Sequence, residues 1–504
     1  MLQFDTPIQA AKWLGARVTG NLQTDSRLVQ AGDGFIAWPG AAADGRRFVR
    51  AALKQGASAC LVEREGVEAF GLEDPSVASY PGLKAATGPV ASRYFAEPSS
   101  ELDVLAVTGT NGKTSTAWWL AQALSGLDAD QAIPCGLVGT LGVGRPPDLQ
   151  STGMTTPDPV LLQRQFRRFV DEGLRACAIE ASSIGLAERR LDGTRIRIAI
   201  FTNFTHDHLD YHGSMAAYWR AKAELFAWPG LRAAVVNLDD PMAPEVLSIL
   251  SGQPVETWTC SMRGSARLQA SDVHYDGSGL TFTVTEGEAS MTLRTRLVGA
   301  FNVANLLGVI GAMRAMGVPL DRSIEACGRL SPVPGRMDCV AWPGRPVVAV
   351  DYAHTPDALE QALIALRPLA SGRGGQIWCV FGCGGDRDVV KRPLMGRLAQ
   401  QHADHVVLTS DNPRSEDPMS IIRAIQAGLE EHERVVEVEQ DRGRAIAHAL
   451  TQARPQDVVL IAGKGHEDYQ EAAGVRQPFS DKECALDVLR HIGAPNAGSA
   501  GGKA

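Results

Sequence analysis

The sequence contains no apolar run that approaches the roughly 18 residues of a membrane-spanning helix. Its first residues lack the basic and apolar stretches of a secretory signal peptide. Basic charge is not in excess either, because 49 Lys and Arg stand against 57 Asp and Glu, a formal net charge of −8. A nucleic-acid-binding surface usually shows a basic bias. We therefore expect no membrane insertion and no nucleic-acid partner.

Cysteine is sparse and scattered. Nine residues, an odd number, are spread along the chain, which indicates reduced thiols in a cytoplasm rather than a disulfide framework. Cys379 and Cys383 are four residues apart, but no second pair lies near them to complete a zinc site. We expect a cytoplasmic protein and a monomer.

Length and composition indicate several globular domains. Hydrophobic residues make up 44% and charged residues 21% of the 504 residues, an ordinary globular balance, and about 150 residues per domain predicts about three domains. Polar stretches that contain proline, near residues 96–100 and 331–335, mark the expected boundaries. We predict domains over residues 1–97, 98–333 and 334–504, with the small polar tail 494–504 disordered.

Strand and helix patterns alternate in the second and third of these segments. An apolar run at 102–108 precedes a glycine loop and a helical stretch at 114–124, the opening of a nucleotide-binding α/β domain. Residues 265–300 alternate like antiparallel strands, and a helical stretch follows at 302–316. Further strand patterns occur at 176–180, 198–202, 347–350, 377–381, 405–409 and 457–461. The third segment is therefore predicted to be a doubly wound α/β unit.

The glycine loop has the composition of a phosphate cradle. Glycines let several N–H groups point at phosphate oxygens, the helix N-terminus and Lys113 add positive charge, and the Thr114 hydroxyl can hold Mg²⁺. Val107 stands where the usual pattern has its first glycine, so the loop is a shortened variant. An incidental Gly-Lys-Thr in a strand–helix turn is the alternative. The residues expected to bind phosphate are Gly109, Thr110, Asn111, Gly112, Lys113, Thr114 and Ser115.

We therefore predict an α/β protein with a smaller N-terminal α/β domain, a central P-loop-type ATPase domain and a C-terminal Rossmann-like domain.

Two strand tips in the central segment carry candidate metal ligands. Glu180 ends one strand, and residues 203–212, which include three histidines, follow the other. Mg²⁺ prefers oxygen ligands, so Glu180 can bind an ion held by Thr114. A zinc site and a solvated polar loop are the alternatives for residues 203–212.

The phosphate loop, the Glu180-Ala-Ser-Ser tip, the Asn203 to His212 loop and the Tyr218 to Lys222 stretch together resemble the Mur ligases. These are ATP-dependent enzymes that form amide bonds in peptidoglycan synthesis, and the motifs stand in the family's order along nearly the whole chain. The resemblance implies an acyl phosphate on the substrate carboxyl, which the incoming amine attacks. It also implies that Lys222, which alone reads as a surface lysine, carries CO₂ as a carbamate and that His208 helps to hold a second metal. The implied metal ligands are Thr114, Glu180, His208 and carbamylated Lys222, and the implied catalytic residues are Lys113, His208 and Lys222.

Later segments resemble further binding sites of the family. The implied contacts with ATP outside the phosphate loop are Asn302, Arg336, Asp351 and His354. Other segments resemble those of family members that add meso-diaminopimelate to UDP-N-acetylmuramoyl-L-alanyl-D-glutamate. A carboxylate at the distal end of that amino acid calls for a bidentate guanidinium, which Arg414 supplies. The residues implied to bind the amino acid are Arg387, Asp411, Asn412, Pro413, Arg414, Gly463 and Glu467.

The residues that bind the UDP-muramoyl dipeptide are the hardest to identify from the sequence. Ala41 and Ala42 stand where the family pattern has polar or larger residues, and Glu188 stands in place of glutamine. Ordinary surface turns remain the alternative for the segments near residues 24 and 41. The residues implied to bind this substrate are Thr24, Ser26, Ala41, Ala42, Ala43, Thr155, Thr156, Ser182, Glu188 and Arg190.

The sequence thus predicts a cytoplasmic ligase that uses Mg²⁺ and ATP to join meso-diaminopimelate to the UDP-muramoyl dipeptide. A lysine-adding muramyl ligase and a folylpolyglutamate synthetase-like ligase are the nearest alternatives, and the Asp411-Asn-Pro-Arg414 loop argues against both. A nucleotide-gated binding protein that hydrolyses ATP without ligation is the alternative from a different functional class.

Overall fold

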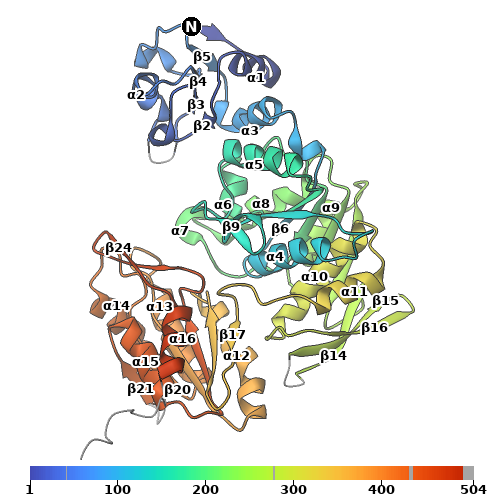
Figure 1. The fold of residues 1–504 in the computed structure, drawn as a ribbon, viewed down its shortest axis with the longest axis vertical. Coiled ribbons are helices and arrows are strands. Elements are labelled where there is room, and N and C mark those ends of the chain that lie inside the picture. Colours follow the sequence, from blue (N-terminus) through green and yellow to red (C-terminus); the bar gives the residue numbers. More distant parts are fainter. Residues whose placement is uncertain (41–42, 276–278, 431–434, 492–504) are drawn as a thin grey trace, which may run out of the picture. The chain divides into compact units, whose positions relative to one another are not determined.

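A computed structural model describes residues 1–40, 43–275, 279–430 and 435–491 (Figure 1). Its internal contacts define two compact units. The first unit comprises Met1–Leu268 and Leu307–Ala326, and the second comprises Gln269–Leu306 and Cys327–Ala504. The domain boundaries expected near residues 97 and 333 stay predictions, and the tail 494–504 lies outside the described residues.

The N-terminal part of the first unit is a five-stranded parallel sheet with the strand order β1-β5-β4-β3-β2. Its central strand β4 is buried along its whole length, and helices α1 and α3 pack against each other. Helix α1 begins where the Thr6 side chain accepts from the Gln9 N–H and proline takes the first helical position. The elements are β1 Leu2–Gln3, α1 Pro7–Gly15, β2 Leu22–Gln23, β3 Gly34–Ala37, α2 Val49–Lys54, β4 Ala59–Glu63, β5 Val77–Tyr80 and α3 Leu83–Tyr94.

The remainder of the first unit contains strands in the order β13-β12-β11-β6-β10-β7-β8-β9. These strands are parallel from β13 to β7, and β8 and β9 add antiparallel pairs. The strands and the helix predicted around the phosphate loop form as β6, β10, β11 and α4. The elements are β6 Asp103–Thr108, α4 Lys113–Ser125, β7 Cys135–Gly139, β8 Gly142–Arg145, β9 Asp148–Gln150, α5 Pro159–Asp171, β10 Ala176–Glu180, α6 Ser183–Ala187, β11 Ile198–Phe201, α7 Leu209–His212, α8 Met215–Ala223, β12 Ala233–Asn237, α9 Ala243–Leu250 and β13 Glu256–Ser261.

After β13 the chain forms three strands and then two helices. Strands β15 and β16 pair antiparallel, as the alternating pattern at 265–300 predicts. The helix expected at 302–316 forms as α10. The bounds are β14 Leu268–Tyr275, β15 Leu280–Glu286, β16 Ala289–Arg294, α10 Phe301–Ala315 and α11 Leu320–Gly328.

The C-terminal part of the second unit is a six-stranded sheet with the order β17-β18-β22-β19-β20-β21, parallel except for β17. All four strands predicted in this segment form, as β18, β19, β20 and β22. Strand β21, helix α15 and the hairpin of β23 and β24 were not predicted. The elements are β17 Asp338–Val340, β18 Val347–Asp351, α12 Pro356–Gly372, β19 Ile377–Phe381, α13 Lys391–His402, β20 His405–Leu408, α14 Pro418–Gln426, β21 Val435–Val438, α15 Arg442–Gln452, β22 Val458–Ala462, β23 Tyr469–Ala472, β24 Val475–Pro478 and α16 Asp481–His491.

This topology gathers polar loops at two sheet edges. In the first unit β6 lies between β10 and β11, so the carboxyl ends of these three strands are neighbours. In the second unit the carboxyl ends of the parallel strands β18, β22, β19 and β20 are likewise neighbours. Ligands of open α/β sheets bind at the carboxyl ends of strands. None of the helices in the described part of the chain is long and apolar enough to span a membrane.

Candidate functional site

The phosphate loop joins β6 to α4 and requires glycine at two positions. Gly109 has φ +149°, and a Cβ there would lie 1.9 Å from the Thr202 Oγ1 atom. Gly112 has φ +84°, a conformation that side-chain-bearing residues rarely adopt. The Lys113 ammonium donates to the carbonyls of Gly109 and Thr110 at 2.9 and 2.8 Å, so it folds back over its own loop.

Residues that follow β11 form hydrogen bonds with the phosphate loop. The Asn203 side chain accepts from the Asn111 N–H at 2.8 Å, and the Thr202 hydroxyl donates to the Asn111 carbonyl at 2.6 Å. The Thr110 hydroxyl lies 3.1 Å from the Tyr218 hydroxyl of α8. These contacts hold the loop's shape, and the sequence motif that contains Tyr218 assigned that residue no part in it.

Glu180 lies beside the start of α4, as predicted. Its carboxylate accepts from the Thr114 hydroxyl at 2.9 Å, from the Thr140 N–H at 2.8 Å and from the Thr140 hydroxyl at 3.2 Å. Glu180 is 1% exposed. Hydroxyl and carboxylate oxygens are the hard ligands that Mg²⁺ prefers, so this donor set fits that ion. Sequence reasoning missed Thr140, which is far from both partners along the chain.

Lys222 is buried, which overturns its interpretation as a surface lysine. It lies on α8 and is 1% exposed, and its ammonium donates to the Gly109 carbonyl at 2.5 Å. Its nitrogen lies 4.6 Å from the centre of the Tyr218 ring. Burial, reinforced by the charge of Lys113, lowers the pKa of Lys222 well below its usual value. A neutral amine is the form of lysine that reacts as a nucleophile.

His208 follows β11 and adopts a left-handed backbone with φ +52°. Burial lowers the pKa of His208, and the charges of Lys113 and Lys222 act in the same direction. The neutral imidazole that results is the form that binds metal ions. Across the described residues, no three His, Cys, Asp or Glu side chains converge on a metal site.

Four residues expected to hold the sugar-peptide converge next to Glu180. The Thr156 hydroxyl donates to the Glu180 carbonyl at 2.6 Å and lies 3.0 Å from the Ser182 hydroxyl. Arg190 donates to the Thr156 carbonyl at 2.9 Å. The hydroxyl of Thr155 lies 3.0 Å from that of Thr140. This cluster therefore shares its framework with the phosphate loop.

Glu188, the departure from the family pattern, is held by two residues that sequence reasoning missed. Lys84 of α3 forms an ion pair with it at 2.8 Å, and the Tyr211 hydroxyl donates to it at 2.5 Å. Burial opposes ionisation, but these two hydrogen bonds outweigh it and lower the pKa of Glu188. Because Lys84 belongs to the N-terminal sheet's helices, the pair ties that sheet to the β6 region.

The N-terminal candidates lie in turns. Thr24 and Ser26 are half-buried beside Asp25, whose side chain accepts from the Arg27 N–H at 2.9 Å. The Ala43 carbonyl accepts from the Gly40 N–H at 3.0 Å. Ala41 and Ala42 lie outside the described residues.

Two of the nucleotide-site candidates of the second unit, Arg336 and His354, lie against Tyr352. The Arg336 guanidinium lies 4.6 Å from the centre of that ring, and the His354 Nδ1 atom lies 2.8 Å from the Tyr352 carbonyl. The Asp351 carboxylate accepts from the Met337 N–H at 2.6 Å. On α10, Asn302 donates to the Val298 carbonyl at 2.7 Å and accepts from the Asn305 side chain at 3.0 Å.

A close backbone contact joins this cluster to the loop after β22. A Cβ at Gly335 would lie 2.1 Å from the His466 nitrogen, so only glycine fits there. The rings of His466 and Tyr352 are 5.2 Å apart. Burial lowers the pKa of His466 to about 4, with Arg336 and Lys464 acting in the same direction. The imidazole is therefore neutral at physiological pH.

The Asp411 to Arg414 loop follows β20 and meets the hairpin of β23 and β24. Arg414 has φ +52°, its N–H donates to the Glu471 carbonyl at 3.0 Å, and its guanidinium donates to the Gly385 carbonyl at 2.7 Å. A Cβ at Gly463 would lie 2.3 Å from the Asp411 carboxylate. Pro413 is buried and Arg387 is exposed.

Asn412 and Glu467 lie together, and a buried lysine holds them. The Asn412 amide donates to Glu467 at 2.8 Å. Lys464, which is 0% exposed, donates to the Asn412 side chain at 3.1 Å and to Glu467 at 3.0 Å. Sequence reasoning placed Lys464 in a motif but gave it no role.

Three segments of the chain match family models. Residues 107–313 match the Mur ligase middle domain, and residues 335–465 match the Mur ligase, glutamate ligase domain. Residues 19–91 match the Mur ligase family, catalytic domain.

Relatives match along almost the whole chain. A protein of Acidovorax sp. (strain JS42) named UDP-N-acetylmuramoyl-L-alanyl-D-glutamate–2,6-diaminopimelate ligase is 62% identical over 489 residues, 96% of this chain and 97% of the relative. A Pseudomonas aeruginosa protein of the same name is 45% identical over 477 residues, 94% of this chain and 96% of the relative.

Solved structures share the fold. A structure of a ligase with that same name is 37% identical and covers 93% of this chain and 94% of its own, with a TM-score of 0.67. The Thermotoga maritima MurF ligase in complex with ADP is 18% identical with a TM-score of 0.64 and covers 94% of this chain and 97% of its own. Both likenesses confirm the predicted three-domain α/β architecture.

Proposed function

The chain belongs to the Mur ligase family, and from this premise we propose that it joins meso-2,6-diaminopimelate to the D-glutamate side chain of UDP-N-acetylmuramoyl-L-alanyl-D-glutamate. The reaction consumes ATP and forms an amide bond in peptidoglycan precursor synthesis. The 62% identity to a ligase of that name, over 96% of the chain, carries the proposal. It agrees with the function that the sequence motifs predicted.

The phosphate loop and its neighbours are the proposed centre of phosphoryl transfer. The loop N–H groups and the Lys113 ammonium would hold the triphosphate and stabilise the charge of the transferring group. Thr114 and Glu180 would hold Mg²⁺, which would supply positive charge to offset that of the phosphates. Catalysis of this kind consists mainly of positioning and electrostatic stabilisation.

Lys222 is the proposed site of carbamylation. Its buried nitrogen with a lowered pKa would attack CO₂, lose a proton to water and become an anionic N-carboxylate. The modification converts a cation next to the phosphate loop into an oxygen ligand for a metal ion. His208, whose imidazole is neutral, would hold the same second ion.

The loops after β20 and β22 are the proposed site for meso-diaminopimelate. Arg414 and Arg387 would bind the carboxylates, and Glu467 with the Gly463 carbonyl would accept from the distal ammonium. Asn412 orients Glu467 through the hydrogen bond between them. An amino acid without the distal carboxylate, such as lysine, leaves the guanidinium unpaired.

The UDP-muramoyl dipeptide is proposed to contact both parts of the first unit. Thr155, Thr156, Ser182 and Arg190 would hold its peptide end beside the metal ligands. Thr24, Ser26 and the backbone near Ala43 would contact the uridine end. Glu188 is engaged by Lys84 and Tyr211, so its proposed part is to hold helix α3 and Tyr211 in place rather than to bind substrate.

Phosphate release measured with ATP, Mg²⁺ and the UDP-muramoyl dipeptide tests the proposal. We expect release that depends on meso-diaminopimelate and that L-lysine does not replace. Release with lysine instead would favour the lysine-adding ligase, and release without any amino acid would favour a nucleotide-gated binding protein.

The cytoplasmic location and the monomeric state stay predictions. All nine cysteines are free thiols, in keeping with a cytoplasmic location.

Replacing Arg414 with alanine is expected to raise the KM for meso-diaminopimelate about 10- to 100-fold. A charge-assisted hydrogen bond contributes roughly 1.5–3 kcal/mol, and about 1.4 kcal/mol is a factor of ten. Steady-state kinetics with ATP saturating measure the effect. Arg423→Ala, which removes an exposed arginine from the neighbouring helix α14, is the control. An unchanged KM in Arg414→Ala would contradict the assignment of this loop.

A further inference from the structure

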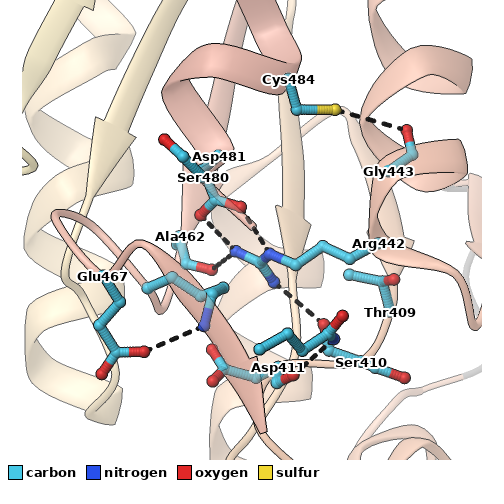
Figure 2. A network of polar contacts seen from close by, with 12 residues as sticks. Thr409, Ser410, Asp411, Arg442, Gly443, Ala462, Glu467, Ser480, Asp481 and Cys484 are labelled. Carbon is cyan, nitrogen blue, oxygen red and sulfur yellow. Dashed lines mark hydrogen bonds and ion pairs between the residues drawn. The ribbon is translucent and has the colours of Figure 1, made fainter. Parts of the chain in front are cut away.

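Arg442 and Asp481 form a fully buried ion pair in the second unit (Figure 2). Arg442 begins helix α15 and Asp481 begins helix α16. The guanidinium donates to both carboxylate oxygens, from Nε at 2.7 Å and from Nη2 at 2.7 Å. Both side chains are 0% exposed. Such a pair carries a large desolvation penalty and is weak evidence of a contribution to stability.

The remaining donors of Arg442 reach two strand ends. Nη2 donates to the Ala462 carbonyl at 2.9 Å, and Nη1 donates to the Ser410 carbonyl at 3.3 Å (Figure 2). Ala462 is the last residue of β22 and immediately precedes Gly463. Ser410 follows β20 and immediately precedes Asp411. One rigid guanidinium therefore contacts the chain directly before each of the two amino-acid loops.

The two loops also meet beyond this point. The Asp411 carboxylate lies so close to Gly463 that a Cβ there would be 2.3 Å from it. Lys464 joins Asn412 of one loop to Glu467 of the other. The loops thus touch each other beyond their first residues, and Arg442 contacts the backbone directly before each of them. A guanidinium suits this task because its five donors have a fixed planar geometry.

We propose that Arg442, locked by Asp481, is a positioning residue that sets the spacing of the loops after β20 and β22 and thereby the selectivity for meso-diaminopimelate. Arg442 does not touch the amino acid; it acts through Asp411, Gly463 and Glu467. The inference rests on the proposed function, because it assigns these loops to the amino-acid substrate.

The double variant Arg442→Met/Asp481→Leu tests this role. Removing one partner alone leaves a buried charge uncompensated and disrupts folding, whereas an apolar pair of similar volume preserves it. We expect the double variant to keep its thermal unfolding midpoint and its KM for ATP. We expect its KM for meso-diaminopimelate to rise about tenfold or more, and its preference for meso-diaminopimelate over L-lysine, as the ratio of kcat/KM values, to fall by a similar factor.

A matched control lies at the other end of the same sheet. Arg367 and Asp404 form an ion pair at 2.7 Å next to the start of β20, and Arg367 also donates to the His402 carbonyl at 2.6 Å. Arg367→Met/Asp404→Leu therefore removes an ion pair, more exposed at 38% and 26%, at the opposite end of β20 from the loops. We expect it to leave both the KM for meso-diaminopimelate and the preference over lysine unchanged.

Arg442→Lys provides a second, independent variant. A lysine keeps the charge opposite Asp481, but one ammonium cannot reproduce the fork that reaches Ser410 and Ala462 together. We expect a folded protein with a raised KM for meso-diaminopimelate. Unchanged KM and selectivity in either folded variant would overturn the positioning role. A wild-type enzyme that turns over ATP without using meso-diaminopimelate would instead overturn the proposed function, so the two failures are distinct.

Discussion

Replacing Lys113 with methionine is expected to lower the kcat for phosphate release about 100- to 1,000-fold. The loss of one preorganised electrostatic donor at a developing charge has an effect of this size. In the structure the Lys113 ammonium is held by the carbonyls of Gly109 and Thr110, above the loop whose N–H groups would hold the phosphates. Release of phosphate with all three substrates and Mg²⁺ measures the effect.

The control for this variant is Lys54→Met, which removes an exposed lysine from α2 in the N-terminal sheet. It is expected to have the wild-type rate. Methionine retains most of the side-chain volume of Lys113, so the thermal unfolding midpoint is expected to stay the same. A Lys113→Met enzyme that retained a substantial rate would show that the loop is not the catalytic phosphate cradle.

Replacing Lys222 with alanine is expected to lower activity by about 100-fold or more, because it removes the proposed carbamate and with it a metal ligand. Acetate or propionate, which can supply a carboxylate in the space left by the side chain, is expected to restore part of the rate. Lys222→Arg is the matched variant: it keeps the charge, cannot be carbamylated and leaves no space, so it is expected to be inactive without rescue. Wild-type activity in Lys222→Arg would exclude the carbamate.

The same residue predicts a pH dependence. Only the unprotonated amine combines with CO₂, and burial together with the charge of Lys113 lowers the pKa of Lys222, which raises the unprotonated fraction of the amine at a given pH. Acidification through the lowered pKa protonates the amine and disfavours the carbamate. We therefore expect activity to fall on the acid side and added bicarbonate to oppose that fall. A rate that does not respond to bicarbonate at any pH would contradict this expectation.

The sequence predicted the elements that a run of neighbouring residues marks by itself. The apolar run at 102–108, the glycines after it and the helical stretch at 114–124 form β6, the loop and α4 as expected. The four strands of the C-terminal sheet that are continuous apolar runs were also predicted. Strands β1 and β2, which have two residues each, carry no pattern long enough to recognise.

Contacts between distant segments could not be predicted in the same way. Lys222 stands between Ala221 and Ala223 in a helical stretch, and the carbonyl that accepts from its buried ammonium belongs to Gly109, 113 residues earlier in the chain. Lys84 and Glu188 meet only because α3 packs near the β6 region, and Arg442 meets Asp481 only because α15 packs on α16. A charged side chain is buried when tertiary structure brings it a partner, and no local spacing encodes that partner.

The close contact between Gly335 and His466 has a consequence for how substrates bind. His466 contacts Tyr352 on the nucleotide side of its loop, and Glu467, the next residue, belongs to the amino-acid side. The two candidate sites therefore share one peptide unit, and the backbone beside it lies against Gly335 with no room for a Cβ between them. If a substrate shifts this element when it binds at either proposed site, occupancy of the two sites is linked, and the linkage must be reciprocal. Whatever factor ATP exerts on the affinity for the amino acid, the amino acid exerts on the affinity for ATP.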